Sequence, residues 1–238
     1  MIIIFPMAGL SSRFTKAGYK VPKYMLDING NSVFYHAVNS FNRYFDDCKF
    51  LFIYRDIQDT KSFIKKECEN MGLKSYNMVE LKFETQGQAH TVQLGLDISN
   101  SDLNDSILIF NIDTFRPNFI LPNSFDISKI DGYLEVFEGE GDHWSFVMPQ
   151  NIDDVAKTTE KDRISSLCSS GLYYFGKASD FISIFKKSFE SNDRSKGEFY
   201  IAPLYNELIA NGKIIKYFKI KLDEIVFCGT PQEYERLV

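Results

Sequence analysis

The residues best suited to chemistry lie in the first part of the chain, up to Lys23. The short apolar run Ile2–Phe5 is typical of a buried strand, and it leads into the small-residue turn Pro6–Phe14. A strand that ends in a Gly/Ser turn exposes several backbone N–H groups together, and such a group of donors binds phosphate. Arg13 and, ten residues later, Lys23 add fixed positive charge to the same place. The combination suits the phosphates of a nucleoside triphosphate.

A lone glycine after a strand also has an ordinary explanation, because such turns often do no more than redirect the chain. The nearby charge argues for phosphate, since Arg13, Lys16, Lys20 and Lys23 lie within eleven residues that contain no acidic side chain. A solvated basic face would look the same, but it needs no strand and turn before it. The turn is not a P-loop, which requires Gly-Lys-Ser/Thr at the start of a helix. Gly9 also lacks the two further glycines of the dinucleotide-binding fingerprint.

Asp113 follows the apolar run Ser106–Phe110, which predicts a buried strand, so this carboxylate lies where a strand ends. Mg²⁺ prefers hard oxygen ligands and usually takes one or two carboxylates together with phosphate oxygens. An ion held here would bridge two phosphates and offset their repulsion. An aspartate that caps a turn has the same sequence signature, but the position at a strand end favours a metal ligand.

The order Ala8-Gly9-x-Ser11-Ser12-Arg13-Phe14 followed by Pro22-Lys23 resembles the signature of the sugar-phosphate and small-molecule nucleotidyltransferases. These pyrophosphorylases make CDP-, UDP-, dTDP- or GDP-activated compounds. The usual form of the motif is Gly-x-Gly-x-Arg, and Ser11 stands here at the second glycine. In size and opening the chain is similar to the single-domain cytidylyltransferases, and the similarity extends from Met1 to the C-terminus.

The resemblance implies a role for individual residues. Arg13 and Lys23 would be catalytic, with Lys23 beside the attacking phosphate and the α-phosphate. The nucleotide would be bound by the first turn and by a loop before a helix, that is by Met7, Ala8, Gly9, Leu10, Ser11, Ser12, Arg13, Gln86 and Gly87. The acceptor would be bound by Glu160, Lys161, Gly171, Tyr173 and Glu198. Outside this context Glu160-Lys161 is typical of a surface charge pair.

The loop Thr85–Ala89 has two readings of equal weight. Gly87 would let a nucleobase approach the backbone, and Gln86 can both donate and accept hydrogen bonds at a base edge. The family commonly has Gly-Thr-Ala here, and Gln88 replaces the threonine. An ordinary helix N-terminus would look similar.

The C-terminal motif departs from the family pattern. Many relatives have Asp-x-Gly-Thr-Pro, whereas this chain has Phe227-Cys228-Gly229-Thr230-Pro231. A phenylalanine therefore stands where a second metal-binding acid is usual. Asp223 or Glu224, a few residues upstream, is the candidate replacement ligand, and water or the substrate phosphates are the alternatives that would complete the metal shell.

The composition excludes several classes of function. The 238-residue chain has a net charge of −5, which argues against generic binding of nucleic acid or of an anionic membrane. Its four cysteines form no Cys-x-x-Cys pair, which predicts reduced thiols in a cytoplasmic protein and no zinc site. The three histidines, His36, His90 and His143, do not form a metal-binding set.

Strand and helix patterns alternate through the first half of the chain. Strands are predicted at 2–5, 24–28, 50–54, 76–81 and 106–110, and helices at 33–41, 61–71 and 88–96. This alternation predicts β-α-β units, right-handed crossovers and a largely parallel sheet. Since ligands bind at the carboxyl ends of such strands, the first turn, Thr85–Gln88 and Asp113 should meet in one crevice.

In the second half of the chain, strand and helix patterns no longer alternate regularly. Strands are predicted at 132–137, 144–148, 164–167, 172–175, 214–220 and 225–228, and helices at 178–189, 198–211 and 231–237. The resemblance implies a three-layer, Rossmann-like (GT-A-like) α/β fold with a mixed, mainly parallel sheet. We expect residues 1–238 to form one domain, with a nucleotide-binding half at 1–113 and an acceptor-binding half at 114–238.

These observations predict a Mg²⁺-dependent nucleotidyltransferase. It would transfer a nucleoside monophosphate from an NTP, with CTP favoured, to a phosphorylated small molecule or sugar phosphate and release pyrophosphate. Surface or capsular polysaccharide synthesis is the role the resemblance implies, and a homodimer is compatible with it. A GT-A-type glycosyltransferase, with Asn111-Ile112-Asp113 as its metal motif, and a non-catalytic nucleotide-sensing module remain alternatives.

Overall fold

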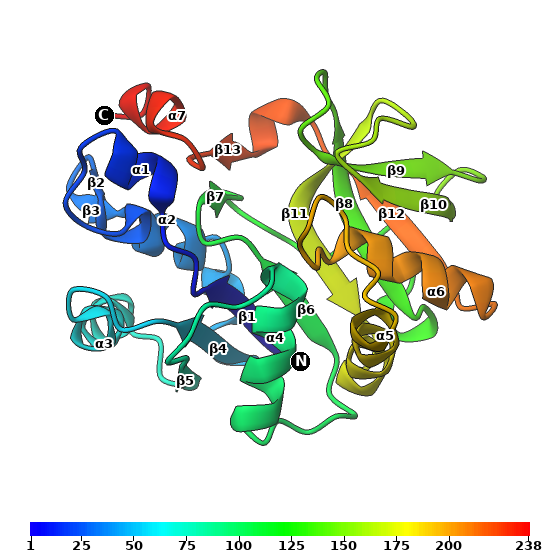
Figure 1. Ribbon diagram of the computed structural model, residues 1–238, viewed down its shortest axis with the longest axis horizontal. Helices are drawn as coiled ribbons and strands as arrows, with labels where there is room; N and C mark the ends of the chain where they lie inside the picture. Colours follow the sequence, from blue (N-terminus) through cyan, green and yellow to red (C-terminus); the bar gives the residue numbers. More distant parts are fainter.

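A mixed nine-stranded sheet runs through the centre of the computed structural model, which describes residues 1–238 (Figure 1). Its strands are β1 (Ile2–Met7), β4 (Lys49–Tyr54), β5 (Tyr76–Glu80), β6 (Ile107–Phe110), β8 (Gly132–Glu138), β9 (Ser145–Pro149), β10 (Val155–Glu160), β11 (Leu167–Phe175) and β12 (Ile215–Lys219). The main path is β10-β9-β11-β6-β1-β4-β5, with β8 beside β11 and β12 beside β8. Two small ribbons complete the strands: β2 (Asp27–Ile28) with β3 (Asn31–Ser32), and β7 (Thr114–Phe115) with β13 (Val226–Phe227).

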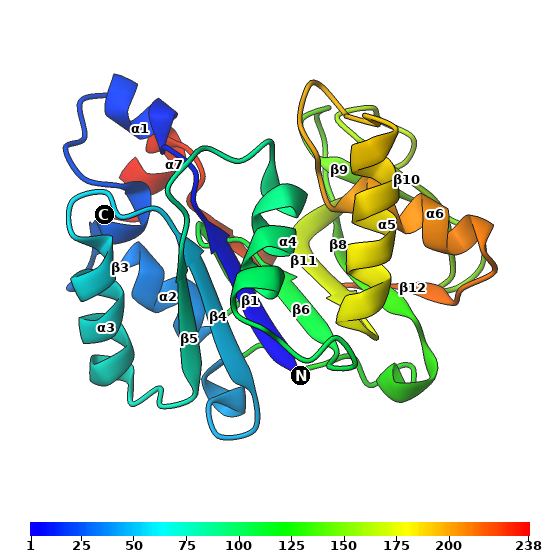
Figure 2. The same ribbon diagram turned by 60° about the horizontal axis from the view of Figure 1, so that its bottom comes forward.

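Helices cover both faces of this sheet, which makes three layers (Figure 2). The α-helices are α1 (Ser12–Lys16), α2 (Val33–Asn39), α3 (Thr60–Met71), α4 (Gln88–Ile98), α5 (Ala178–Glu190), α6 (Tyr205–Ala210) and α7 (Pro231–Glu235). Short 3₁₀ turns are η1 (Lys23–Met25), η2 (Asn42–Tyr44), η3 (Ile127–Lys129), η4 (Ala202–Leu204) and η5 (Leu222–Glu224). The expected three-layer α/β fold is therefore confirmed.

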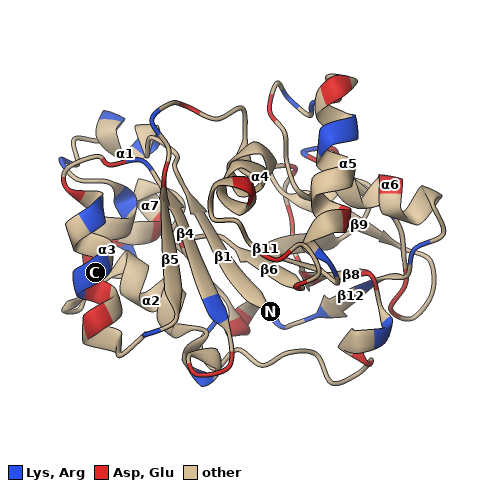
Figure 3. Ribbon diagram, turned by 90° about the horizontal axis from the view of Figure 1, so that it is seen from below, with Lys and Arg blue, Asp and Glu red and all other residues tan.

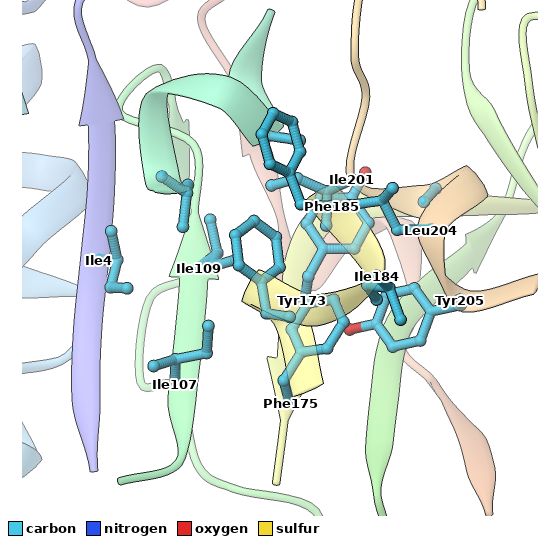
Figure 4. Close-up of a cluster of buried hydrophobic side chains, with 14 of the residues drawn as sticks. Ile4, Ile107, Ile109, Tyr173, Phe175, Ile184, Phe185, Ile201, Leu204 and Tyr205 are labelled. Carbon is cyan, nitrogen blue, oxygen red and sulfur yellow. The ribbon is translucent and has the colours of Figure 1, made fainter. Parts of the chain in front are cut away.

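The parallel half of the sheet explains the continuous apolar runs. β1 pairs in parallel with β4 and β6, and β4 pairs in parallel with β5. Successive side chains of β1 alternate between faces, so that Ile2 and Ile4 pack with α4 and α5 while Ile3 and Phe5 pack with α2 and α3. Because both faces are covered, every position of such a strand is apolar. Figure 4 shows one of the two cores, where Ile4, Ile107 and Ile109 lie near Phe175, Phe185 and Tyr205.

The other half of the sheet is mostly antiparallel. β11 pairs antiparallel with β6, β8 and β9, and only β8 and β12 are parallel to each other. The register of β11 against β8 shifts between Ser169 and Tyr173, around Gly171, whose φ is 89°. A Cβ on Gly171 would lie 2.3 Å from Asn111 Nδ2, so glycine is needed here for both its conformation and its size. This bulge turns the middle of β11 toward the end of β6.

Several predicted elements are wrong in type or extent. Residues 24–28 form a 3₁₀ turn and a two-residue strand, and 164–167 is largely bend rather than strand. The predicted helix 198–211 is helical only from 202, and the end of the predicted turn Pro6–Phe14 is part of α1. β10 was missed because it is an edge strand with the exposed residues Ala156 and Lys157, which leave little apolar pattern.

Charged side chains lie mainly on the helices and loops, and the central strands carry few of them (Figure 3). No helix has the length and apolar character needed to cross a bilayer.

Candidate active site

Two adjoining cavities lie at the carboxyl ends of β1 and β6. The turn cavity, of about 580 Å³, is lined by residues of the first turn and of the loop Glu84–Gln88. The aromatic cavity, of about 420 Å³, is lined by Arg13, Trp144, Phe227 and Glu160 among others. Both cavities share one wall, which consists of Ser11, Lys23, Gln88, Asn111 and Asp113. A molecule in one cavity therefore lies next to a molecule in the other across this wall.

The first turn takes a shape that its motif requires. Ser11, at the position of the family's second glycine, has a φ of 52°, in the left-handed region that favours glycine. Its Oγ accepts a hydrogen bond from the Lys23 backbone N–H at 3.2 Å, which joins the two halves of the motif. Phe14 is buried and anchors α1. A side chain on Gly9 would meet no atom within 4 Å, so the backbone there is open to a ligand.

Lys23 and Asp113 meet at the centre of the shared wall. The Lys23 ammonium donates to Asp113 Oδ2, and the two side chains keep 24% and 18% exposure. The Asp113 carbonyl accepts from the Cys228 N–H at 2.8 Å, because β7 and β13 pair at this point. A cation and a carboxylate thus lie where the contents of the two cavities would meet.

A second carboxylate lies near Asp113, but it is not one that we expected. A Cβ on Gly229 would lie 3.0 Å from Asp113 Oδ2 and 3.7 Å from Glu233 Oε2, so both oxygens flank this glycine. Glu233 also accepts from the Thr230 N–H in a capping box at the start of α7. The carboxylates of Asp113 and Glu233 both line the aromatic cavity, and their hard oxygens are of the kind that Mg²⁺ prefers.

Asp223 and Glu224 do not reach this place, and the expectation that one of them joins Asp113 is corrected. Both belong to η5 and line neither cavity. The Glu224 carboxylate accepts from the Lys221 N–H, and the Glu224 carbonyl accepts from Arg116. Phe227 itself lines the aromatic cavity.

The loop before α4 is held by the second half of the chain. Gly87 has a φ of 124°, and a Cβ there would lie 2.5 Å from the Phe199 carbonyl oxygen. The Phe199 N–H donates to the Gln86 carbonyl at 2.8 Å, and the Ala89 N–H donates to the Phe199 carbonyl at 3.0 Å. The close approach that Gly87 permits is therefore to the chain's own backbone. Gln86 and Gly87 both line the turn cavity.

The aromatic cavity combines ring faces with one buried carboxylate. The Trp144 ring centroid lies 4.9 Å from that of Phe227 and 4.5 Å from that of His143. Glu160, 8% exposed, accepts from Ser145 Oγ, and burial raises the pKa of its carboxyl. Burial also raises the pKa of Tyr173 to about 12, so this phenol stays neutral. Aromatic faces and a buried acid can bind a sugar ring or an ammonium group.

A buried ion pair between Arg116 and Glu135 contacts the bulge of β11 through Ser170. Arg116 donates to Glu135 Oε1 at 2.9 Å, and Ser170 Oγ donates to the same oxygen at 2.9 Å. Burial raises the pKa of Glu135, against the opposing effect of Arg116. Ser170 lines the aromatic cavity, so this pair fixes part of the cavity wall.

Most of the predicted site residues lie at the two cavities. The turn cavity holds Met7, Ala8, Gly9, Leu10, Gln86 and Gly87, and the aromatic cavity holds Ser12, Arg13, Glu160, Gly171 and Tyr173. Ser11 and Lys23 belong to both. Glu198 lines the turn cavity, away from the predicted acceptor residues. Lys161 lines neither cavity, and its ammonium donates to the hydroxyl of Tyr200, a residue of the aromatic cavity, at 2.5 Å.

Sequence reasoning gave no place in the predicted site to several lining residues, among them Asn111, Arg194 and Glu233. Two of these residues left a signal, since Asn111 follows the apolar strand directly and Glu233 comes two residues after the Gly229-Thr230-Pro231 motif. Arg194 lies in a region without a local motif for a ligand.

The fold and the shared wall define a nucleotidyltransferase-type α/β protein. No family model and no curated protein matches the chain. Among solved structures, a nucleoside-diphosphate-sugar pyrophosphorylase from Vibrio cholerae RC9 is 48% identical over 100% of this chain and 99% of that one, with a TM-score of 0.94. The chain belongs to this family of pyrophosphorylases, within the NTP transferases.

More distant structures share the fold. A putative glucose-1-phosphate thymidylyltransferase from Bacillus anthracis is 20% identical, covers 99% and 92% of the two chains, and has a TM-score of 0.77. The inositol-1-phosphate CTP transferase from T. maritima is 15% identical, covers 98% and 90%, and has a TM-score of 0.75.

Proposed function

We propose that this chain transfers a nucleoside monophosphate from an NTP to a phosphorylated small molecule and releases pyrophosphate. The shared wall carries the proposal, because it joins a cavity lined by a phosphate-binding type of turn to one suited to an acceptor. The family, whose Vibrio cholerae member is described as a nucleoside-diphosphate-sugar pyrophosphorylase, supports this class of reaction. The acceptor phosphate attacks the α-phosphorus in line, and the bond to the pyrophosphate leaving group breaks.

The chain's own residues bind and orient the reactants. The backbone of Gly9–Ser12 holds the β- and γ-phosphates, and the Arg13 guanidinium approaches these phosphates from the side of the aromatic cavity, which it lines. Lys23 stabilises the charge that grows on the α-phosphate. No general base is needed, because the attacking phosphate oxygen is already an anion. Catalysis then comes from positioning and from charge stabilisation.

Mg²⁺ is part of this proposal, with Asp113 and Glu233 as its carboxylate ligands. When bound, the ion would supply charge neutralisation between the two phosphates. Asp113→Asn should weaken binding of Mn²⁺, measured by its electron paramagnetic resonance in the presence of NTP, and should remove the Mg²⁺ response of turnover. An unchanged Mn²⁺ affinity would show that other groups hold the metal.

The donor and the pathway are finer parts of the proposal. CTP is the proposed nucleotide, supported by the opening motif and by the size of the chain. A sugar 1-phosphate, or an alcohol phosphate that carries an ammonium group, would suit Glu160 and the ring faces of Trp144 and Phe227. Synthesis of surface or capsular polysaccharide is the proposed role.

Phe227 favours one second candidate, a nucleotide-sensing protein without catalysis, because it removes the usual second acid. The experiment that separates the candidates is a pyrophosphate-release screen of ATP, CTP, GTP and UTP, each against sugar 1-phosphates, phosphocholine and related acceptors. Pyrophosphate that appears only when an NTP and one acceptor are both present supports the proposal. Binding of NTP without release under any combination favours the sensor, and glycosyl transfer from a nucleotide sugar favours a glycosyltransferase.

A further inference from the structure

The loop between α5 and η4 brings Arg194 into the wall of the turn cavity. The guanidinium donates to Asn192 Oδ1 at 2.7 Å, to the Gly197 carbonyl at 3.4 Å and to Gln86 Oε1 at 2.5 Å. It also lies over the Phe199 ring, 4.7 Å from the centroid. A guanidinium has five N–H groups, so these three bonds leave two donors for a ligand. The contacts on several sides hold the plane of the guanidinium in place.

This arrangement also decides the orientation of the Gln86 amide. Arginine has donors and no acceptor, so Gln86 must present its carbonyl oxygen to Arg194. The Gln86 backbone N–H donates to His90 Nδ1 at 3.2 Å, and its backbone carbonyl accepts from Phe199. Of the polar groups of Gln86, the side-chain NH₂ alone is left for a ligand. Arg194 and Gln86 together therefore offer donors, and no acceptor, to this part of the cavity.

His90 stabilises this arrangement by accepting the hydrogen bond from the Gln86 backbone N–H. Burial lowers the pKa of its imidazole, and the charge of Arg194 lowers it further. The neutral ring retains an unprotonated Nδ1, which is the acceptor that the Gln86 N–H needs.

We propose that Arg194 is a specificity-determining residue which, by holding the Gln86 amide with its NH₂ toward the cavity, makes the site select cytosine. The Watson–Crick edge of cytosine has two adjacent acceptors, N3 and O2. Uracil and thymine carry an N3–H donor in the middle of that edge, and two donors that face each other leave both unsatisfied. On their Watson–Crick edges adenine and guanine have no adjacent pair of acceptors, and the larger guanine has such a pair, O6 and N7, only on its Hoogsteen edge. The inference rests on the proposed function and assigns CTP as its nucleotide.

The test compares the binding of CTP and UTP by calorimetry, with Mg²⁺ present and without any acceptor. The wild-type protein should bind CTP about 10- to 100-fold more tightly than UTP, the range expected when a donor is left unsatisfied against the N3–H of uracil. In Arg194→Met the Gln86 amide is free to rotate and accept from uracil N3–H. The ratio of the two affinities should then fall to within about threefold.

Arg163→Met is the matched control. Arg163 donates to the Gly139 and Gly141 carbonyls and lies over the Phe146 ring, so it resembles Arg194 in its contacts. It lines neither cavity, and its substitution should leave the ratio of CTP to UTP affinity unchanged.

Two CTP analogues test which atoms are read. An analogue without the exocyclic amine keeps N3 and O2 and should bind nearly as well as CTP, whereas 3-deaza-CTP should bind much like UTP. Wild-type protein that binds UTP as tightly as CTP would overturn the inference, and so would an Arg194→Met protein that keeps the wild-type ratio. If those results come with pyrophosphate release, the proposed function stands and this inference alone fails. If no NTP binds, both fail.

Discussion

The turn cavity and the aromatic cavity recognise their contents by different means. The turn cavity lies at the end of β1, against the backbone of the first turn, where even Ser11 takes the conformation that favours glycine. The aromatic cavity adds to the residues of the shared wall the side chains of Glu160 and Trp144, from the mostly antiparallel half. Backbone donors bind any phosphate, while side chains define one molecular shape. The difference teaches that the binding of phosphate and the choice of acceptor depend on different residues, and substitutions should separate the two.

The largest expected effect comes from removing the cation of the shared wall. Lys23→Ala should lower kcat/KM by about 10²–10³-fold, because a donor aimed at transition-state charge is worth about 2.7–4 kcal/mol. Lys20→Ala, an exposed lysine with no ion pair, is the control. Pyrophosphate release measures the loss, and circular dichroism checks the fold. Near wild-type turnover of Lys23→Ala would place the reaction elsewhere.

A larger residue at Gly171, in the bulge of β11 beside the aromatic cavity, should lower the stability of the protein. Gly171→Ala places a Cβ 2.3 Å from Asn111 at a positive φ, and we expect a loss of about 2–4 kcal/mol in the free energy of unfolding. Gly212→Ala is the matched control, since its φ of 74° is similar but its Cβ would meet no atom within 4 Å. Urea unfolding of both proteins compares them. Equal losses would mean that backbone conformation, rather than contact with Asn111, decides the effect.

Substitution of the buried acid Glu160 should weaken binding of the acceptor and leave binding of the nucleotide unchanged. Glu160→Gln removes a charge that faces the aromatic cavity, so the acceptor KM should rise about 10-fold while the affinity for NTP stays constant. Steady-state kinetics and calorimetry measure the two quantities. The exposed Glu138→Gln serves as control. If both substrates weaken together, the two cavities do not act separately.

The smallest expected effect is on the pH dependence of stability, through His90, which binds the loop before α4. The pKa of His90 is lowered from its ordinary value of 6.5, so the unfolded chain takes up a proton at higher pH than the folded protein. Its contribution to stability is therefore complete above about pH 6.5 and declines as the pH falls below that value. His90→Asn keeps an acceptor for Gln86 but does not titrate. The slope of its unfolding free energy between about pH 7 and pH 5 should be shallower than that of the wild type.

Strands buried on both faces were the most predictable part of the fold. β1, β4 and β6 leave an apolar residue at nearly every position, so their place is clear from the chain alone. β10 left no such signal, because one face of an edge strand meets water. The helix expected from 198 begins only at 202, since Phe199 is held by hydrogen bonds to the loop before α4.

The sequence by itself determined the strands that are buried on both faces, the first turn and its two cations. These features depend on residues that are close in the chain, so their pattern is visible without coordinates. Only the tertiary structure decided that Glu233, and not Asp223 or Glu224, lies beside Asp113, because the pairing of β7 with β13 sets that approach. It also decided that Arg194 meets Gln86, 108 residues away in the chain. No local pattern encodes a distance between segments so far apart, because that distance is set by how the sheet and its helices pack together.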